Sequence, residues 1–314
     1  MGGEINNMHK TTIPIEYYDH EDRDNVCFLC DEPKYTLKYN VTHFDFPFNF
    51  KKCQCGIEKQ TPMPNEKFFE WFFNSDIFYS AKDTKKKHIW GFYDYFKDEP
   101  SRLATSKRRY KKLSHVFEKK KPLNIMKVGP STGTFLHVAK EKGHNALGCD
   151  VSCEFVNWAK EKYNVQIDHG RFEKIEYTNG QFDVLMLFNV IENIPNQDEF
   201  FKSVNNRLNK GGHFIFNFVD ETNNWVSRIQ KAKYFMYRPP ICYIYTYKVV
   251  EMIMEKYGFK IVSNFRDVRY MHLEKILTLL SWNWALPIIR ALKIDTINFP
   301  IFAYPSRIIV AEKI

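Results

Sequence analysis

The sequence predicts an α/β fold built on a doubly wound, mostly parallel sheet, and three observations lead to this prediction. Short apolar segments alternate with segments of helical periodicity between residues 124 and 219, a pattern that specifies a parallel sheet with helices on both faces. The first apolar segment runs through a glycine turn into a helix. The segment that ends at Phe188 is almost continuously apolar, as expected of a central strand covered on both faces.

The individual elements follow from these periodicities. Strands are expected at 124–129, 145–151, 166–169, 182–190 and 213–219, and helices are expected to begin at Thr134, Cys153 and Asp198. The glycines within 209–212 mark a passage from helix to strand. A helix is expected over 247–257, and Gly258 ends it. Strands over 259–265 and 306–311 complete the series.

Two close pairs of cysteines lie near the N-terminus. Cys27 and Cys30 form the first pair, Cys53 and Cys55 form the second, and 22 residues separate the pairs. This layout lets four thiolates reach one tetrahedral zinc ion, which is structural because four protein ligands leave no open position. Because the second pair has the short C-x-C spacing, one thiolate ligand is expected to have strained geometry, or another group such as His43 takes its place. The alternative to a zinc site is a set of reduced thiols that hold no metal.

The chain divides into four expected regions. They are an N-terminal arm at 1–22, a zinc-ribbon-like module at 23–60, a helical connector at 61–121 and a nucleotide-binding domain at 122–314. Within the connector, 66–73 carries phenylalanines at helical spacing, which are expected to pack against the neighbouring domain. A basic amphipathic helix is expected over 102–117.

The glycine turn indicates the ligand class. Gly129 and Gly133 bracket a turn whose small residues let backbone approach a ligand closely. Asp150 ends the next strand, where a carboxylate can accept hydrogen bonds from both hydroxyls of a ribose. The turn reads G-x-S-x-G, with Ser131 in place of the second glycine of a dinucleotide fingerprint, and this favours S-adenosylmethionine over NAD.

Several motifs carry a resemblance to a known family. They are Trp90-Gly-Phe-Tyr-Asp-Tyr95, Glu99-Pro-Ser-Arg-Leu-Ala-Thr105, the stretch 182–193, Leu208-Asn-Lys-Gly-Gly212 and Tyr237-Arg-Pro-Pro240. With these motifs and the glycine turn, the chain resembles class I S-adenosylmethionine-dependent methyltransferases almost from end to end. It is most similar to the branch with an N-terminal cysteine-knuckle module, often found in polysaccharide and lipid-linked sugar pathways. The resemblance implies a Rossmann-like methyltransferase sheet that ends in an antiparallel hairpin, interrupted here by an insertion at 268–303.

The resemblance also implies a set of cofactor residues. Backbone around the glycine turn contacts the methionine portion of the cofactor, the acid at the end of the second strand holds the ribose, and the adenine edge lies after the third strand. Asn189, at the end of the fourth strand, is expected towards the substrate. The residues expected at the cofactor are Gly129, Ser131, Gly133, Asp150, Val151, Arg171, Phe172 and Asn189.

At three places the chain departs from the family pattern. Lys127 stands where the family usually has an acid that helps to hold the cofactor's amino group, and Asn193 and Ile241-Cys242 stand where histidines are common. The general base is therefore unassigned. The remaining candidates near the ligand are Glu192, His169, Asp220, Glu221 and His272.

Net charge and cysteine content indicate which class of partner and which cellular compartment to expect. The net charge of +9 favours an anionic partner such as RNA, a phosphorylated substrate or a membrane surface. Seven cysteines, an odd number, favour a reducing compartment over a secreted disulfide framework. No signal peptide or apolar membrane-spanning segment is visible, so a cytoplasmic protein is expected. Peripheral contact with the inner face of a membrane is a further expectation compatible with this location.

The aromatic insertion has three open interpretations. Its tryptophans and leucines predict a satellite core, a membrane-interface helix or a lid, and a membrane contact would involve 276–292.

The function of the protein also has three interpretations. They are methyl transfer to a sugar or sugar-derived metabolite, free or lipid-linked; methylation of an RNA base; and a catalytically degenerate domain that acts as a binding or scaffold protein.

Overall fold

The fold is taken from a computed structural model of the 314-residue chain. The structure describes residues 15–19, 26–31, 35–43, 46–75, 78, 95–118, 122–178, 180–222, 224–302 and 305–314. Most of the expected N-terminal arm at 1–22 lies outside the described residues, except for 15–19. Residues 90–94 of the first family motif also lie outside them.

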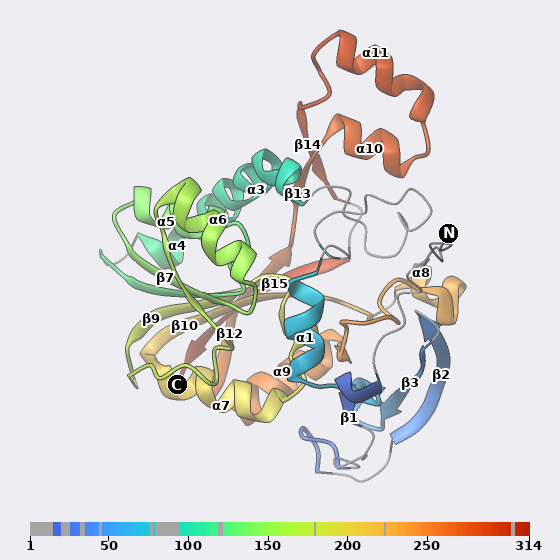
Figure 1. The fold of residues 1–314 in the computed structure, drawn as a ribbon. Coiled ribbons are helices and arrows are strands. Elements are labelled where there is room, and N and C mark those ends of the chain that lie inside the picture. Colours follow the sequence, from blue (N-terminus) through green and yellow to red (C-terminus); the bar gives the residue numbers. More distant parts are fainter. Residues whose placement is uncertain are drawn as a thin grey trace, which may run out of the picture.

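A seven-stranded sheet forms the centre of the protein (Figure 1). Its strands, in spatial order, are β12 (Phe259–Arg266), β15 (Ser306–Lys313), β10 (Leu208–Val219), β9 (Phe182–Leu187), β6 (Asn124–Val128), β7 (Asn145–Asp150) and β8 (Gln166–His169). The strands from β6 to β10 run parallel, and β15 lies antiparallel between β10 and β12. The predicted fold class is confirmed.

Helices cover both faces of this sheet (Figure 1). They are α3 (Glu99–Lys112), α4 (Ser114–Phe117), α5 (Thr134–Glu141) and α6 (Cys153–Tyr163) on one face, and α7 (Gln197–Arg207) and α9 (Tyr247–Lys256) on the other. Successive residues of a strand point to opposite faces, so Ile125 belongs to the core under α3, α4 and α5, whereas Met126 belongs to the core under α7 and α9.

Most observed boundaries lie within two residues of the expected ones, and three elements differ by more. β10 begins at Leu208, because the glycines at 211 and 212 form an irregularity within the strand and not the end of a helix. The basic helix breaks at Leu113 into α3 and α4. β9 ends at Leu187, since Asn189 adopts a positive φ of 58° that a strand cannot continue through.

The cysteine-rich region is joined closely to the rest of the chain. β2 (Tyr35–His43), β3 (Phe46–Cys53) and β4 (Glu58–Thr61) form a four-stranded antiparallel sheet whose edge strand β11 (Tyr243–Ile244) follows the Arg-Pro-Pro segment. β1 (Tyr18–Asp19) pairs with β5 (Met63–Pro64), and α1 (Glu66–Phe73) follows. One hydrophobic core runs from this sheet to the helices α7 and α9.

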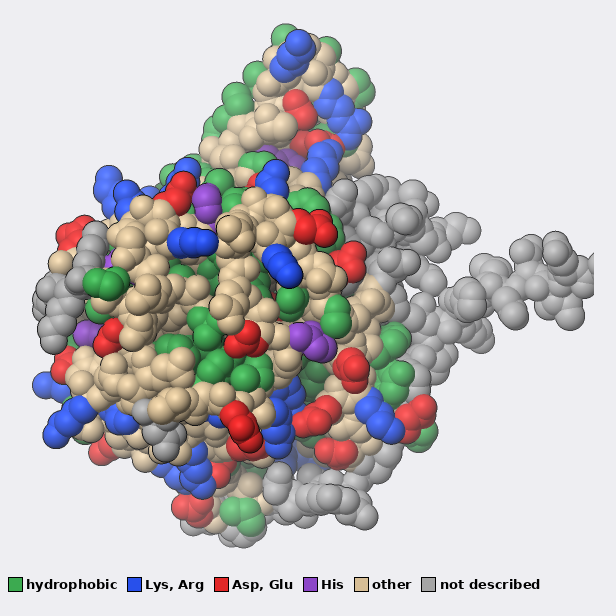
Figure 2. Space-filling model, turned by 60° about the vertical axis from the view of Figure 1, so that its left-hand side comes forward, with side chains coloured by type: hydrophobic (Ala, Val, Ile, Leu, Met, Phe, Trp, Pro, Cys, Tyr) green, Lys and Arg blue, Asp and Glu red, His purple; other side chains and the backbone are tan. Residues whose placement is uncertain are grey.

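The insertion projects from the body of the protein, as Figures 1 and 2 show. Strands β13 (Arg269–His272) and β14 (Asn298–Ile301) pair antiparallel as a stalk, and between them lie α10 (Leu273–Leu279) and α11 (Leu286–Ala291). A short helix, α8 (Trp225–Gln230), lies in the segment after β10. None of the helices in the described part of the chain is both long enough and apolar enough to cross a membrane.

Candidate functional site

A cavity of about 350 Å³ lies at the carboxyl ends of β6, β7 and β9. β7 and β9 flank β6 on opposite sides, so the cavity lies where the strand order reverses, which is the usual ligand position in open α/β sheets. Seven of the eight expected cofactor residues line it: Gly129, Ser131, Asp150, Val151, Arg171, Phe172 and Asn189. The structure thus brings together residues from four separate segments.

The two glycines of the turn have different physical roles. Gly129 has a φ of 59°, and a Cβ there would lie 2.5 Å from Cγ2 of Val190, so only glycine fits beside the cavity. Gly133 does not line the cavity. A Cβ at this position would lie 2.8 Å from Cβ of Ala159, so this glycine allows α5 and α6 to approach each other closely.

Asp150 is held rigidly at the end of β7. Its Oδ2 accepts a hydrogen bond from the backbone N–H of Ser131 (3.0 Å), and its Oδ1 accepts one from the N–H of Ser152 (3.0 Å). The carboxyl group is buried, and burial raises its pKa to about 6 despite these two donors. Each oxygen keeps a second lone pair that can accept a hydroxyl of a ligand.

The residues after β8 form a buried wall of the cavity. The Arg171 guanidinium is fixed by Glu173 and by Glu66 of α1, the latter at 2.8 Å. Phe172 is almost fully buried and packs edge to face with Phe200, and its carbonyl accepts a hydrogen bond from Arg207. These anchored side chains give the expected adenine region a fixed shape.

Asn189 connects the fourth strand of the nucleotide-binding domain to the insertion. Its Oδ1 accepts hydrogen bonds from Nδ2 of Asn217 (2.9 Å) and from Arg269 on β13. Its backbone N–H donates to Oδ1 of Asn217 (2.6 Å). The side chain therefore positions the stalk of the insertion beside the cavity.

Lys127 turns aside from the main cavity. Its Nζ donates to the carbonyls of Val128 (3.1 Å) and Gly129 (3.3 Å) and lies 5.0 Å from the centre of the Phe188 ring. It lines a second cavity, of about 210 Å³, between the glycine turn and α3. Burial lowers the pKa of Lys127 to about 7, so its positive charge is only partly retained at neutral pH.

Among the five candidate bases, only Glu192 lines the main cavity. Its Oε1 accepts a hydrogen bond from the N–H of Val219 (2.9 Å), and burial raises its pKa. The other four have different partners. His272 pairs with Asp98 (2.8 Å), Asp220 pairs with Arg307 (2.7 Å), Glu221 accepts from Asn224 (3.0 Å), and His169 is exposed and lies 3.2 Å from the sulfur of Cys153.

An aromatic wall of the cavity is absent from the expected site residues. It consists of Phe69, Phe72, Phe73, Phe78, Tyr95, Phe155, Phe188 and Phe235. The helical spacing in 66–73 did signal the phenylalanines of α1, but the spacing alone indicates packing against a neighbour and not a ligand. Tyr95 closes the first family motif, and its hydroxyl lies 2.7 Å from Oγ of Ser131 in the glycine turn.

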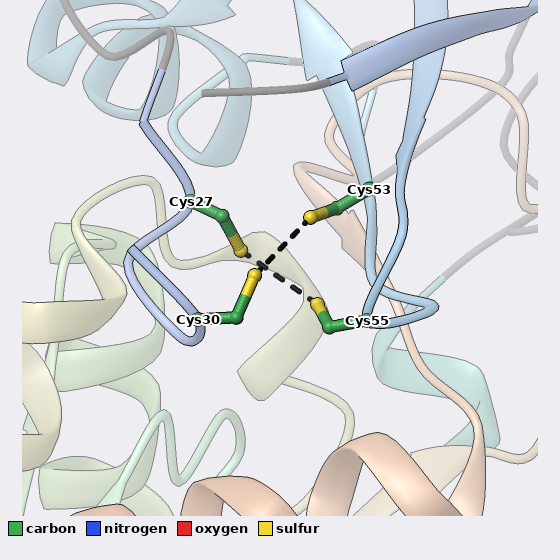
Figure 3. Close-up of side chains that lie close together, drawn as sticks. All are labelled: Cys27, Cys30, Cys53 and Cys55. Carbon is green, nitrogen blue, oxygen red and sulfur yellow. Dashed lines mark hydrogen bonds between the residues drawn. The ribbon is translucent and has the colours of Figure 1, made fainter. Parts of the chain in front are cut away.

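The four N-terminal cysteines converge on one point (Figure 3). All four sulfurs lie within 4.8 Å of one another, with 3.8 Å between Cys27 and Cys55 and 3.4 Å between Cys30 and Cys53. A tetrahedral zinc with Zn–S bonds of ~2.3 Å requires sulfurs ~3.8 Å apart, so this donor set fits the metal. His43 lies at the opposite end of the β2–β3 hairpin and is not part of the cluster.

The strand order, the glycine turn and the buried acid at the reversal point define a class of protein. They are the features of an α/β enzyme domain that binds a nucleotide-type cofactor, with an antiparallel strand inserted near one edge of the sheet. The chain belongs to the methyltransferase-domain family, whose profile matches residues 95–264. Among curated proteins, none matches the sequence.

Solved structures share this fold at low identity. The magnesium protoporphyrin IX methyltransferase of Synechocystis PCC 6803, solved with bound SAH, is 14% identical; the match covers 80% of this chain and 100% of that one, with a TM-score of 0.52. A SAM-dependent methyltransferase of Archaeoglobus fulgidus is 16% identical over 70% of this chain and 99% of its own, with a TM-score of 0.48. These similarities concern the fold of the protein.

Proposed function

We propose that this protein is an S-adenosylmethionine-dependent methyltransferase whose acceptor is a hydroxyl of a sugar or sugar-derived metabolite, free or lipid-linked. The observation that carries the cofactor assignment is the buried Asp150 carboxylate, pinned by Ser131 and Ser152 beside the glycine turn. The sugar acceptor is supported by the resemblance to the cysteine-knuckle branch and by the converging cysteines of the N-terminal module.

The cavity suits the chemical groups of this cofactor. Its volume of about 350 Å³ falls within the range of small-molecule sites, and Asp150 can accept both ribose hydroxyls. The cofactor supplies a methyl group on a positively charged sulfonium that leaves as a neutral thioether. Aromatic rings line the cavity, and such rings can attract a cation through their faces.

The acceptor hydroxyl needs a group that takes up its proton. Glu192 lines the cavity, and its raised pKa lies closer to neutrality than that of an exposed glutamate, as a general base requires. In this proposal, the Glu192 carboxylate would orient the acceptor hydroxyl and take up its proton, and the bound cofactor would supply the methyl group that the hydroxyl oxygen receives.

Lys127 is compatible with this activity. The interpretation as a degenerate domain rests partly on repulsion between Lys127 and the cofactor's amino group. Its ammonium instead donates to the backbone carbonyls of Val128 and Gly129, and burial lowers its pKa towards neutrality. Both facts weaken that repulsion.

Calorimetric titration with S-adenosylmethionine tests the cofactor assignment and has an expected pH dependence. The ionised Asp150 accepts the ribose hydroxyls, and its pKa without ligand is about 6. Affinity is therefore constant above pH 6 and falls by up to about tenfold for each pH unit below it. Binding near pH 6 releases protons, which appear as a dependence of the heat on the ionisation enthalpy of the buffer. No heat at millimolar cofactor contradicts the proposal.

Replacing Glu192 with glutamine is expected to lower methyl transfer by about 10²- to 10⁴-fold while cofactor affinity stays unchanged, because the amide cannot accept the proton. The measurement is transfer of a labelled methyl group to a panel of nucleotide-linked and lipid-linked sugars. The matched control is Glu221→Gln, since Glu221 is a half-buried acid whose pKa is also raised by burial but it does not line the cavity. Equal losses in both variants argue against Glu192 as the base, and transfer to RNA alone favours RNA base methylation.

A further inference from the structure

The exposed apolar side chains of the protein are concentrated on the insertion. Of the sixteen large hydrophobic side chains that are exposed in the described part of the chain, nine lie between residues 279 and 302. We call residues 279–292 the tip. Its exposed side chains are Leu279, Leu280, Trp282, Trp284, Ile288 and Leu292. A soluble surface rarely gathers this much apolar area unless it meets a partner.

Few hydrophobic side chains of the two helices in the insertion are buried. In α10 and α11 together, Leu277 and Ile289 are the buried hydrophobic side chains, whereas Trp284 keeps 73% of its surface exposed. The satellite-core interpretation therefore accounts for two side chains and leaves the tryptophans outside. In Figure 2 the projecting insertion shows hydrophobic side chains on its surface, together with basic and acidic ones.

The insertion is fastened to the body and holds a fixed orientation. Glu274 accepts hydrogen bonds from Lys97 (2.9 Å) and from Arg290 of α11 (2.5 Å). Asp98, at the start of α3, accepts from His272 (2.8 Å) and from Lys275. Two ion clusters thus join the hairpin to the segment 97–98, so the apolar tip is held away from the protein.

The charge of the tip selects among partners. Residues 279–292 contain no acidic residue; Arg290 is exposed although it pairs with Glu274, and the exposed Lys293 follows the tip directly. Tryptophan and lysine or arginine side chains beside exposed leucines are the combination found at the boundary between water and lipid, and cations near the surface bind anionic headgroups. We infer that the tip docks onto an anionic lipid surface.

Docking would place the site at that surface. Arg269 of the stalk lines the main cavity and donates to Asn189, so the insertion and the mouth of the cavity are built as one unit. A lipid-linked acceptor could then enter the cavity without leaving the membrane. This last step rests on the proposed function, whereas the docking itself does not.

Vesicle sedimentation tests the docking. The full chain is expected to sediment with vesicles of phosphatidylcholine and phosphatidylglycerol and not with phosphatidylcholine alone, and added salt should weaken the binding. The double variant Trp282→Ser/Trp284→Ser is expected to lose binding at least about tenfold. Both tryptophans are exposed, so its unfolding midpoint should match that of the parent protein.

Trp225→Ser is the matched control, because Trp225 is 69% exposed but lies on α8. Its vesicle binding is expected to remain. The inference is overturned by absent binding to the anionic vesicles, by equal loss in the control, or by a dimer in solution that only the double variant dissociates. Titration with S-adenosylmethionine reports on the proposed function separately, so a chain that binds vesicles but no cofactor refutes only that function.

Discussion

Replacement of Asp150 by asparagine is expected to weaken S-adenosylmethionine binding by about a hundredfold or more. The carboxylate accepts one backbone N–H on each oxygen and keeps one lone pair on each for the ribose. In asparagine, the amide NH₂ must face either Ser131 or Ser152 as a donor against a donor. The substitution also removes the negative charge from the site. Each hydrogen bond to a charged group contributes about 1.5–3 kcal/mol, so its loss weakens binding by about that amount.

The matched control for this variant is Asp168→Asn. Asp168 lies on the adjacent strand β8 and accepts from the hydroxyl of Tyr177 (2.9 Å), but it lines neither of the two cavities at the glycine turn. Calorimetry should therefore give parental affinity for Asp168→Asn and greatly reduced affinity for Asp150→Asn. Equal affinity in all three proteins would show that the ribose is held elsewhere.

Loss of the metal centre is expected to have the largest effect on stability. We expect one zinc per chain in the purified protein and none in Cys27→Ser, because three thiolates hold the ion far more weakly than four. Since zinc binding contributes to folding free energy, the unfolding midpoint should fall by roughly 10 °C or more. Elemental analysis and thermal unfolding measure the two effects.

Loss of the zinc ion is also expected to disturb the cofactor cavity. β4 pairs with β11, the N–H of Gln60 donates to the carbonyl of Cys242 (2.8 Å), and Glu58 accepts from Lys38 (2.6 Å) and Tyr237 (3.1 Å). These contacts hold the loop that supplies part of the cavity wall. Cofactor affinity is therefore expected to fall together with the metal content.

Cys153→Ser is the control for the metal centre, because Cys153 is exposed and lies outside the cysteine cluster. It should keep both its zinc and its unfolding midpoint. Full zinc occupancy in Cys27→Ser would show that the ion lies elsewhere, and an unchanged midpoint after metal loss would show that the module folds without it.

Local sequence patterns were sufficient for most of the fold. The alternation of apolar and helical segments gave the strands around Gly129 and Asp150 nearly to the residue, since a parallel sheet needs both periodicities in that order. Two side-chain constraints at the turn were also readable, because close backbone approach and tight helix packing both require glycine. The boundaries at Leu208 and Leu187 were less predictable, since they depend on an irregularity and on a positive φ.

The residues of the site could be predicted only in part from the sequence, for a different reason. Lys127 occupies a strand whose two faces serve different cavities, and its position in the sequence does not show to which side its ammonium turns. The phenylalanines of α1 come from a segment far from the glycine turn, so their place in the cavity depends on how that helix packs. Glu192 is distinguished from the other candidate bases by its position in the cavity, which its residue type does not indicate.

The sequence by itself determined the doubly wound sheet, the glycine turn with its acid and the cysteine pairs, because these depend on periodicity and spacing along short segments. The tertiary structure decided which groups face the ligand, that all four sulfurs converge while His43 does not, and that the cysteine-rich sheet shares a core with the methyltransferase domain. It also placed the exposed tryptophans on the tip of the insertion, whose stalk lies beside the cavity. These features depend on contacts between segments far apart in the chain, and such contacts are determined only when the whole core packs.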